Sequence, residues 1–364
     1  MARDTSSEQA ARFARSILTR NLKVRPGENV TIEGWSHALP WAVALAREAR
    51  RLKAHPLVLY EDEESFWDAV DHREEASFGA SPSHEWAALA KTDVYIHMWG
   101  PGDKVRLGTL PVKRQERILA WNGAWYKAAA KAGLRGARLE VGRPYPSLAK
   151  VYGVDEEGWR DQVMAASMVD PEKLRTTGDR IAKALKGGRR VRIWDNQGTD
   201  LTLGLLGRPV RVNAGLITPE ERKRPYGMMT SLPSGAVSVA LDESVADGRI
   251  SANRSSYLDD GKATGGVLEF RNGRLVAQQF DTGGSLFEGP YRRGGKGRDQ
   301  PGQLRIGLNP KLHDTPQLED IEAGAITVSV GGNGHLPGGK NTSRYFGFVV
   351  NAGAHLEIDG KSIL

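Results

Sequence analysis

The sequence predicts an α/β protein: a parallel α/β domain in the first half and a mainly antiparallel, β-rich domain in the second. In residues 1–187, short apolar runs alternate with segments of helical periodicity, which is typical of a parallel sheet covered by helices. From residue 188 onward, strand-like runs follow one another, and most of the turns between them contain glycine. We therefore expect two domains, residues 1–187 and residues 188–364, and the second should carry the active-site-like pocket.

The first domain should open with an amphipathic helix over residues 7–21, where Phe13, Ile17 and Leu18 share one face. Further helices are expected where apolar residues recur at helical spacing, in residues 41–53, 64–70, 85–89, 115–132 and 171–185. Strands are expected at the short apolar runs 30–32, 56–60, 94–98 and 138–141. Gly187 and Gly188 end the last helix, because glycine is a poor helix former.

The second domain should consist of strands joined by turns. The expected strands are residues 191–194, 200–206, 236–241, 267–270, 274–280, 303–308 and 326–330. Turn signals lie between them at residues 196–198 and 271–273, where asparagine and glycine supply the backbone conformations that tight turns require. This order favours antiparallel pairing, since hairpin turns join antiparallel strands.

Composition excludes several classes of protein. The chain of 364 residues has no cysteine, which rules out disulfides, thiolate nucleophiles and sulfur-ligated zinc. No apolar run approaches the roughly 20 residues that span a bilayer, and the N-terminus lacks a signal-peptide core. We expect a cytoplasmic protein. The net charge of +7 is scattered, and its basic clusters lack interleaved aromatic residues, so neither nucleic acid nor membrane is an expected partner.

Three stretches of the second domain have a familiar framework: residues 231–236 (SLPSGA), 302–310 (GQLRIGLNP) and 325–331 (AITVSVG). With residues 24–30 (VRPGENV), 198–202 (GTDLT) and 338–343 (GGKNTS), they resemble the thermophilic metalloaminopeptidases of the aminopeptidase T and S group. The resemblance covers essentially the whole chain. It implies a two-domain α/β fold, a homodimer, and an active site in the C-terminal domain.

The chain departs from this family at the metal ligands. Where the family usually carries two glutamates and a histidine, this sequence has Ala236, Gln303 and Thr327. After Ser343 the family usually places His-x-Asp, which also serves iron in the related dihydroxypyridine dioxygenases. Depending on a one-residue choice of alignment, the histidine becomes Tyr345 or Phe346, and the aspartate becomes Gly347 or Phe348. These residues are poor ligands for a divalent ion, so we expect neither a metal nor any other cofactor.

A vacated metal site should leave a neutral, hydrogen-bonding pocket, because the surrounding packing preserves its shape. The candidate catalytic residues are Thr327, Gln303, Tyr345 and His335. A hydroxyl acts as a nucleophile only with a base in reach, and His335 is the nearest base in sequence. The candidate substrate-binding residues are Asn333, Lys340, Asn341, Arg344, Phe346, Phe348 and, after a strand of the first domain, Trp99. Asp259 and Asp260 are alternative bases, although a polar turn is the simpler interpretation.

Three functions remain open from the sequence. The first is a metal-independent hydrolase, or a related ring- or amide-modifying enzyme, acting on a small polar substrate that is aromatic or amide-bearing. The second is a metal-dependent aminopeptidase whose ligands are not recognised. The third is a dimeric pseudoenzyme that binds a ligand without converting it. We give the first hypothesis the greatest weight, because polar residues occupy several former ligand positions.

Overall fold

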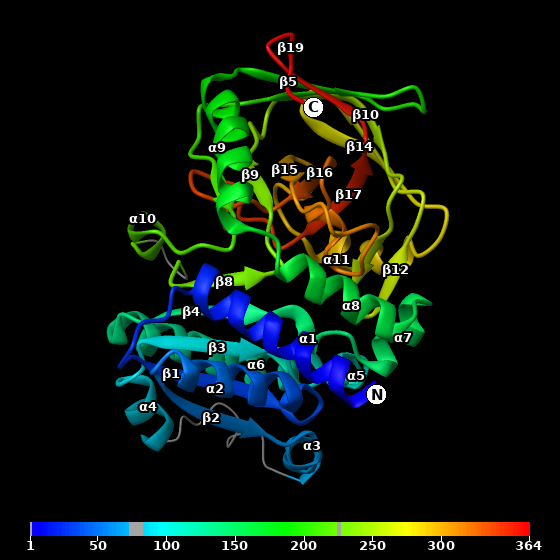
Figure 1. Cartoon of the computed structure of the whole chain (residues 1–364). Coiled ribbons are helices and arrows are strands. Elements are labelled where there is room, and N and C mark those ends of the chain that lie inside the picture. The colour runs from blue at the N-terminus through cyan, green and yellow to red at the C-terminus, as the bar shows by residue number, and fades with distance from the viewer. Residues whose placement is uncertain (1, 73–82, 224–226) are drawn as a thin grey trace. The chain divides into compact units, whose positions relative to one another are not determined.

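The computed structural model describes residues 2–72, 83–223 and 227–364. The chain forms two compact units, and it passes between them three times. Unit 1 comprises Met1–Met168 and Gly215–Pro233, and unit 2 comprises Val169–Ala214 and Ser234–Leu364 (Figure 1). Within the described ranges, no helix combines the length and the apolar character needed to cross a membrane.

Unit 1 is built on a parallel sheet with the strand order β2-β1-β3-β4-β8. Its strands are β1 (Asn29–Trp35), β2 (His55–Glu61), β3 (Val94–Met98), β4 (Arg135–Leu139) and β8 (Met229–Leu232). Its helices are α1 (Ala2–Ser16), α2 (Leu39–Arg51), α3 (Glu63–His72), α4 (Ser83–Leu89), α5 (Lys104–Thr109), α6 (Val112–Ala132), α7 (Pro146–Tyr152), α8 (Glu156–Ser167) and α10 (Pro219–Arg222). The predicted parallel α/β half is confirmed.

Helices cover both faces of this sheet. On one face, Gly34 of β1 lies so close to Ala42 of α2 that a larger side chain would crowd it. On the other face, Tyr95 of β3 packs edge-on against Trp125 of α6, with ring centroids 4.8 Å apart. Two-sided burial explains why the strands are apolar nearly throughout rather than alternating with polar residues.

Strand β8 joins the first sheet from a distant part of the sequence. Residues 229–232 pair in parallel with β4, although they lie beyond the expected domain boundary at residue 187. The helix α9 (Pro171–Gly187) belongs to unit 2, where Gly178 leaves room for Val212. In the compact units, α9 belongs to unit 2 and β8 belongs to unit 1, so each lies on the other side of the expected boundary. The division into residues 1–187 and 188–364 stays a prediction.

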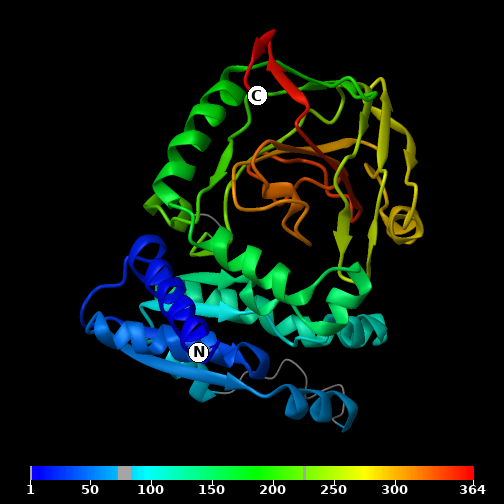
Figure 2. The ribbon, with the colours of Figure 1, turned by 45° about the vertical axis from the view of Figure 1, so that its right-hand side comes forward.

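Unit 2 is β-rich and antiparallel in every pairing of its strands that the structure describes. One sheet has the order β17-β16-β15-β9-β7, and a second has the order β14-β13-β10-β6-β5-β18-β19 (Figures 1 and 2). The first comprises β7 (Arg211–Asn213), β9 (Ala236–Ala240), β15 (Pro301–Gly307), β16 (Ala325–Gly331) and β17 (Phe346–Ala352). The second comprises β5 (Arg190–Trp194), β6 (Asp200–Gly204), β10 (Ala246–Ser251), β13 (Val267–Arg271), β14 (Arg274–Gln279), β18 (His355–Ile358) and β19 (Lys361–Ser362). The short strands β11 (Ser256–Leu258) and β12 (Gly261–Ala263) form a hairpin, and α11 (Ser285–Arg293) follows β14.

The two large sheets of unit 2 share one apolar core. Side chains of the five-stranded sheet such as Val237, Ile306 and Ile326 point into this core together with Leu201 and Phe270 of the seven-stranded sheet. Successive residues of a strand point to opposite faces. The alternate residues of β9, β15, β16 and β17 therefore lie on the face of the five-stranded sheet that is turned away from the core.

Candidate functional site

The outer face of the five-stranded sheet is polar. Arg305 lies opposite Ser238 of β9 and opposite Thr327 of β16, and Thr327 lies opposite Val350 of β17. Residues paired across antiparallel strands project from the same face, so these side chains are neighbours. We call this surface the polar face, and its members used below are Ser238, Gln303, Arg305, Thr327, Ser329, Phe346 and Phe348.

Gln303 and His335 form a hydrogen-bonded pair on the polar face. The β15–β16 register shifts between Pro301 and Leu304, and the Gln303 backbone N–H donates to Ser329 Oγ at 2.9 Å. The buried Gln303 side chain presents its Oε1 to His335 Nε2 at 3.1 Å. Because an amide oxygen can only accept, Nε2 carries the proton and the Nδ1 of a neutral ring keeps a free lone pair.

Positive charge surrounds this histidine. Burial lowers the pKa of His335, and the nearby guanidinium groups of Arg211 and Arg305 lower it further. The imidazole is therefore neutral at pH 7, as a general base must be before it accepts a proton.

Thr327 contributes a hydroxyl that the protein itself leaves unpaired. The residue is only 2% exposed, and within residues 2–72, 83–223 and 227–364 its Oγ1 has no hydrogen-bond partner. A buried hydroxyl without a partner destabilises a fold by about 1–3 kcal/mol. Such a group, at a position where the resemblance places a metal-binding histidine, is well suited to bind a water molecule or a ligand.

Arg305 brings a guanidinium group to the same face. Its Nε lies 3.2 Å from Asp320 Oδ2 in the short 3-10 helix η5 (Glu319–Ile321), and both side chains are about a quarter exposed, at 27% and 26%. The geometry makes an ion pair without an aligned hydrogen bond, since Arg305 Nε has no hydrogen-bond partner among the described residues. The planar fork of this arginine is consequently not saturated by its acidic neighbour.

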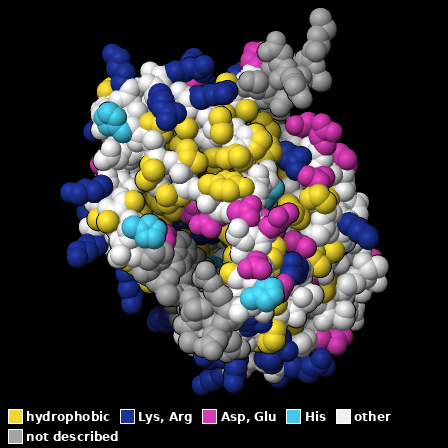
Figure 3. All heavy atoms as spheres, turned by 90° about the horizontal axis from the view of Figure 1, so that it is seen from below, with side chains coloured by type: hydrophobic (Ala, Val, Ile, Leu, Met, Phe, Trp, Pro, Cys, Tyr) yellow, Lys and Arg dark blue, Asp and Glu magenta, His cyan; other side chains and the backbone are white. Residues whose placement is uncertain are grey.

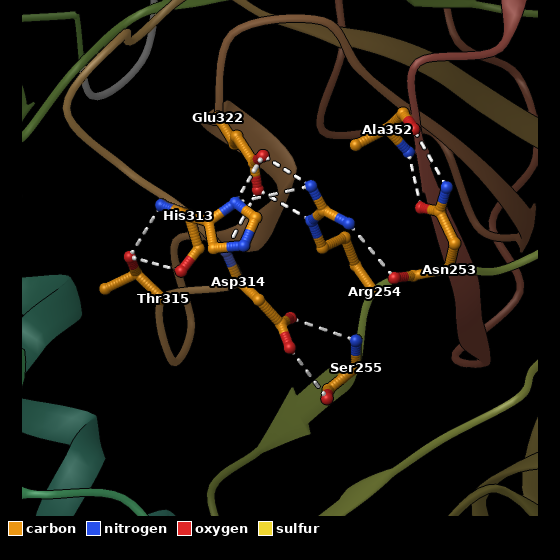
Figure 4. A network of polar contacts seen from close by, with 8 residues as sticks. All are labelled: Asn253, Arg254, Ser255, His313, Asp314, Thr315, Glu322 and Ala352. Carbon is orange, nitrogen blue, oxygen red and sulfur yellow. Dashed lines mark hydrogen bonds and ion pairs between the residues drawn. The ribbon is translucent and has the colours of Figure 1, made fainter.

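A polar network anchors the segment that carries Asp320. Figure 4 shows Arg254 and His313 converging on the carboxylate of Glu322, which lies two residues beyond Asp320. Arg254 donates from Nε at 2.9 Å and from Nη2 at 2.7 Å, and the Asp314 N–H adds a third bond at 2.9 Å. Burial alone would raise the pKa of Glu322, but these hydrogen bonds lower it. The network fixes η5 beside Arg305.

Aromatic side chains form one wall. His335 meets Phe346 edge-on with ring centroids 5.7 Å apart, and Phe346 lies 5.9 Å from Phe348. Phe346 is 39% exposed, so part of its ring is accessible. Phe348 opposes Ser329 and therefore shares the polar face with Thr327. Of the two alignments left open by the sequence, the one that assigns the His-x-Asp positions to Phe346 and Phe348 directs both toward this face.

The structure does not bring Tyr345 to the polar face. This side chain is 1% exposed, and its hydroxyl donates to Gln278 Oε1 of β14 at 2.6 Å. Its ring packs edge-on against Tyr291 of α11. Burial raises the pKa of Tyr345 well above the usual range of a tyrosine, so the phenol stays protonated. The reason for the separation is strand alternation, which turns neighbouring residues to opposite sides.

The glycine-rich loop of residues 331–341 is held by its asparagines. Asn333 Nδ2 donates to Glu243 Oε1 at 2.9 Å and to the Gly302 carbonyl at 3.1 Å, and Asn333 Oδ1 accepts from the Asn341 N–H. Arg208 donates to both oxygens of Glu243. Burial would raise the pKa of Glu243, but the bonds from Arg208 and Asn333 lower it to about 2. Asn333 and Asn341 thus position the loop that carries His335.

A cavity of about 460 Å³ lies between this loop and the start of β17. Its lining includes five of the predicted residues: His335, Asn341, Arg344, Tyr345 and Phe346. Lys340 is exposed, and its backbone N–H contacts Glu243. Asp259 lies in the turn between β11 and β12, as the simpler interpretation predicted, and accepts a hydrogen bond from Gln317.

Trp99 lies in unit 1, near the carboxyl ends of its parallel strands. Its ring is flanked by three cations, namely Lys104, Arg138 and Arg143, at 4.3–5.3 Å from the ring centroid.

Sequence reasoning missed Ser238, Arg211 and Arg305 of unit 2. Counting two residues from Gln303 along a strand would have found Arg305, since residues two apart share a face.

Acidic residues gather in unit 1 beside His97, whose Nδ1 lies 3.1 Å from the buried Glu33. Burial and the charge of Glu33 raise the pKa of Glu61, and burial with both glutamates raises the pKa of Glu85 to about 7. Figure 3, seen from below, shows acidic side chains near the centre of one face, beside hydrophobic ones. Even so, no group of three or more histidine, aspartate or glutamate residues in the described part of the chain could hold a metal ion.

Comparison with known proteins places this geometry in context. The model of a family described as thermophilic metalloprotease (M29) matches residues 6–289. The fold is similar to wild-type AmpT from Thermus thermophilus, with a TM-score of 0.71, 16% identity, and coverage of 98% of this chain and 99% of that one. It is also similar to a 2,5-dihydroxypyridine dioxygenase from Pseudomonas putida KT2440, with a TM-score of 0.62, 15% identity, and coverage of 98% and 95%. No curated protein matches the sequence.

Proposed function

Because the chain belongs to the thermophilic metalloprotease family (M29), as its motifs predicted, we propose that it is a hydrolase whose metal centre has been replaced by a hydrogen-bonding pocket. The observation that carries this proposal is the donor set of the polar face. Ala236 offers no lone pair, and the neutral Gln303 amide and Thr327 hydroxyl replace charged ligands. A divalent ion does not fit such a set. We propose a small polar molecule, aromatic or amide-bearing, as the substrate.

His335 supplies the base in this proposal. Gln303 holds the proton on Nε2, so Nδ1 can take a proton from water as the water oxygen attacks a substrate carbonyl carbon. The same proton then passes to the leaving nitrogen or oxygen as the bond to the carbonyl carbon breaks. In this proposal Arg305 and the Thr327 hydroxyl, which are neighbours across two strands, stabilise the oxyanion, because preorganised donors act strongly in a partly dehydrated site.

A non-catalytic binding protein is the second candidate, and one observation favours it. In the described part of the chain, Thr327 Oγ1 has no partner at all, so no base activates it as a nucleophile. Tyr345, the other hydroxyl considered, is bonded to Gln278 away from the polar face. The proposed enzyme therefore uses water, activated by His335, as its nucleophile, and without turnover the same pocket would only recognise a ligand.

Elemental analysis and substrate profiling test the proposal. We expect less than stoichiometric zinc, cobalt, manganese and iron in purified protein, and hydrolysis of aryl amides or esters that is insensitive to chelators. His335→Ala should lower kcat by about 100-fold or more, the usual contribution of a general base. The matched control is His355→Ala, at an exposed histidine on β18 in the other sheet of unit 2, which should leave turnover unchanged. Stoichiometric metal whose removal abolishes turnover would refute the proposal, and saturable binding without conversion would favour the second candidate.

A further inference from the structure

We propose that the polar face binds the carboxylate of a planar aromatic acid, with Arg305 as the principal anchor and Phe346 beside the ring. This inference rests on the proposed function only in using the same site, and it concerns recognition rather than turnover. The substrate or product would then carry a negatively charged head group, in a place where a relative with metal ligands would hold a cation.

The electrostatics of the site favour an anion. Arg211 and Arg305 both act on His335, and Asp320 is the acidic partner of Arg305. The other acid of η5, Glu319, is buried, and burial raises its pKa well above the usual range of a glutamate. His335 is neutral. Because both guanidinium groups lower the pKa of His335, the electrostatic potential at this ring is positive, which favours an anionic ligand.

Donor geometry favours a carboxylate as that counterion. A guanidinium fork matches the two oxygens of a carboxylate in a bidentate pair, which is stronger than a neutral hydrogen bond. Arg305 meets Asp320 through Nε without an aligned hydrogen bond, so its terminal nitrogens remain available in the described structure. On the neighbouring strand β16, opposite Arg305, the unpaired and buried Thr327 Oγ1 is a further donor for a ligand oxygen.

The aromatic wall favours a flat body for the ligand. Phe346 is partly exposed and meets His335 edge-on, so the two rings form a corner beside the cavity that both line. Aromatic rings gain most from edge-on or offset contacts with another ring. A ring carrying a carboxylate would satisfy this corner and the arginine together.

Equilibrium binding of two isosteric probes tests the inference. By titration calorimetry at pH 7 and low ionic strength, benzoate should bind at least tenfold more tightly than benzamide, since hydrogen bonds to charged groups are the stronger kind. Arg305→Met should abolish this preference, and Arg305→Lys should keep part of it. The matched control is Arg274→Met. Arg274 lies on β14 of the other sheet and is paired with Asp299, so its replacement should leave the preference for benzoate unchanged.

Thr327→Val tests the hydroxyl without changing the charge. We expect weaker benzoate binding in this variant, with little change for benzamide.

Equal affinity for benzoate and benzamide, a preference that survives in Arg305→Met, or no benzoate binding up to about 10 mM would each overturn the inference. These outcomes differ from failure of the proposed function. An inactive protein that prefers benzoate would refute the proposed function and leave this inference intact. Turnover of uncharged amides without that preference would refute this inference and leave the proposed hydrolase intact.

Discussion

Replacing Thr327 with valine should stabilise the protein, although most changes at buried positions do the reverse. Valine has the shape of threonine, with a methyl group where the hydroxyl stands. The Thr327 hydroxyl is buried and lacks a partner among the described residues, and this costs about 1–3 kcal/mol. Thr327→Val removes that cost, so we expect the free energy of unfolding to rise by about 1 kcal/mol. For a unit of this size, the melting temperature should increase by roughly 2–4 °C.

Thr199 provides the matched control. It is also 2% exposed and lies in the same unit, but its Oγ1 accepts hydrogen bonds from the Ser251 N–H at 3.2 Å and from Asn351 Nδ2 at 3.3 Å. Thr199→Val should therefore lower the free energy of unfolding by about 1 kcal/mol or more, because it leaves buried donors without that acceptor. Urea unfolding, followed by tryptophan fluorescence and circular dichroism, measures both variants.

Equal losses of stability in the two variants would refute the reasoning, since they would mean that the Thr327 hydroxyl is bonded as well as that of Thr199. A stabilised Thr327→Val protein with weakened benzoate binding would instead indicate that this hydroxyl is kept for a ligand at the expense of stability.

Three further predictions concern charged groups. Glu319 has a raised pKa in the folded state, so the free energy of unfolding should fall as the pH rises above the unfolded pKa of about 4.5. Glu319→Gln should remove this fall, which urea unfolding at pH 5 and pH 8 measures. Glu85, whose folded pKa is about 7, should likewise weaken the fold as the pH rises toward 7, and NMR titration of its carboxyl carbon should place its midpoint near 7 rather than near 4.5. Arg254→Met should cost about 3 kcal/mol because it leaves the buried carboxylate of Glu322 unpaired, whereas Arg271→Met, at an exposed pair, should cost less than about 1 kcal/mol in the same unfolding assay.

The sequence predicted the two kinds of sheet, because their evidence is local. Alternating helices and apolar runs indicated the parallel sheet, and strands separated by turns indicated the antiparallel ones. Strand β8 could not be predicted in this way. It pairs with β4 across about 90 residues, and nothing in its four residues specifies that partner.

The candidate site was predictable in part, again for a physical reason. Gln303 and Thr327 lie on one face, as their motifs implied, and His335 contacts Gln303 directly. The choice between Tyr345 and Phe346 was not decidable, since a one-residue shift turns a whole strand over. Arg305 was not predicted because it is not one of the expected ligand positions, and nothing in the motif around it identifies an arginine as a functional residue.

The packing around Tyr345 limits which residues can be replaced near it. Its ring and backbone fill the space that side chains at Gly294, Gly331 and Gly347 would need, so a β-carbon at any of these three positions would overlap it. Gly347 meets the phenol itself, so a side chain at this position would fit only where a smaller residue replaces Tyr345, whereas Gly294 and Gly331 meet the β-carbon and the backbone of residue 345. Homologues that keep the tyrosine in this place should therefore keep Gly347 with it.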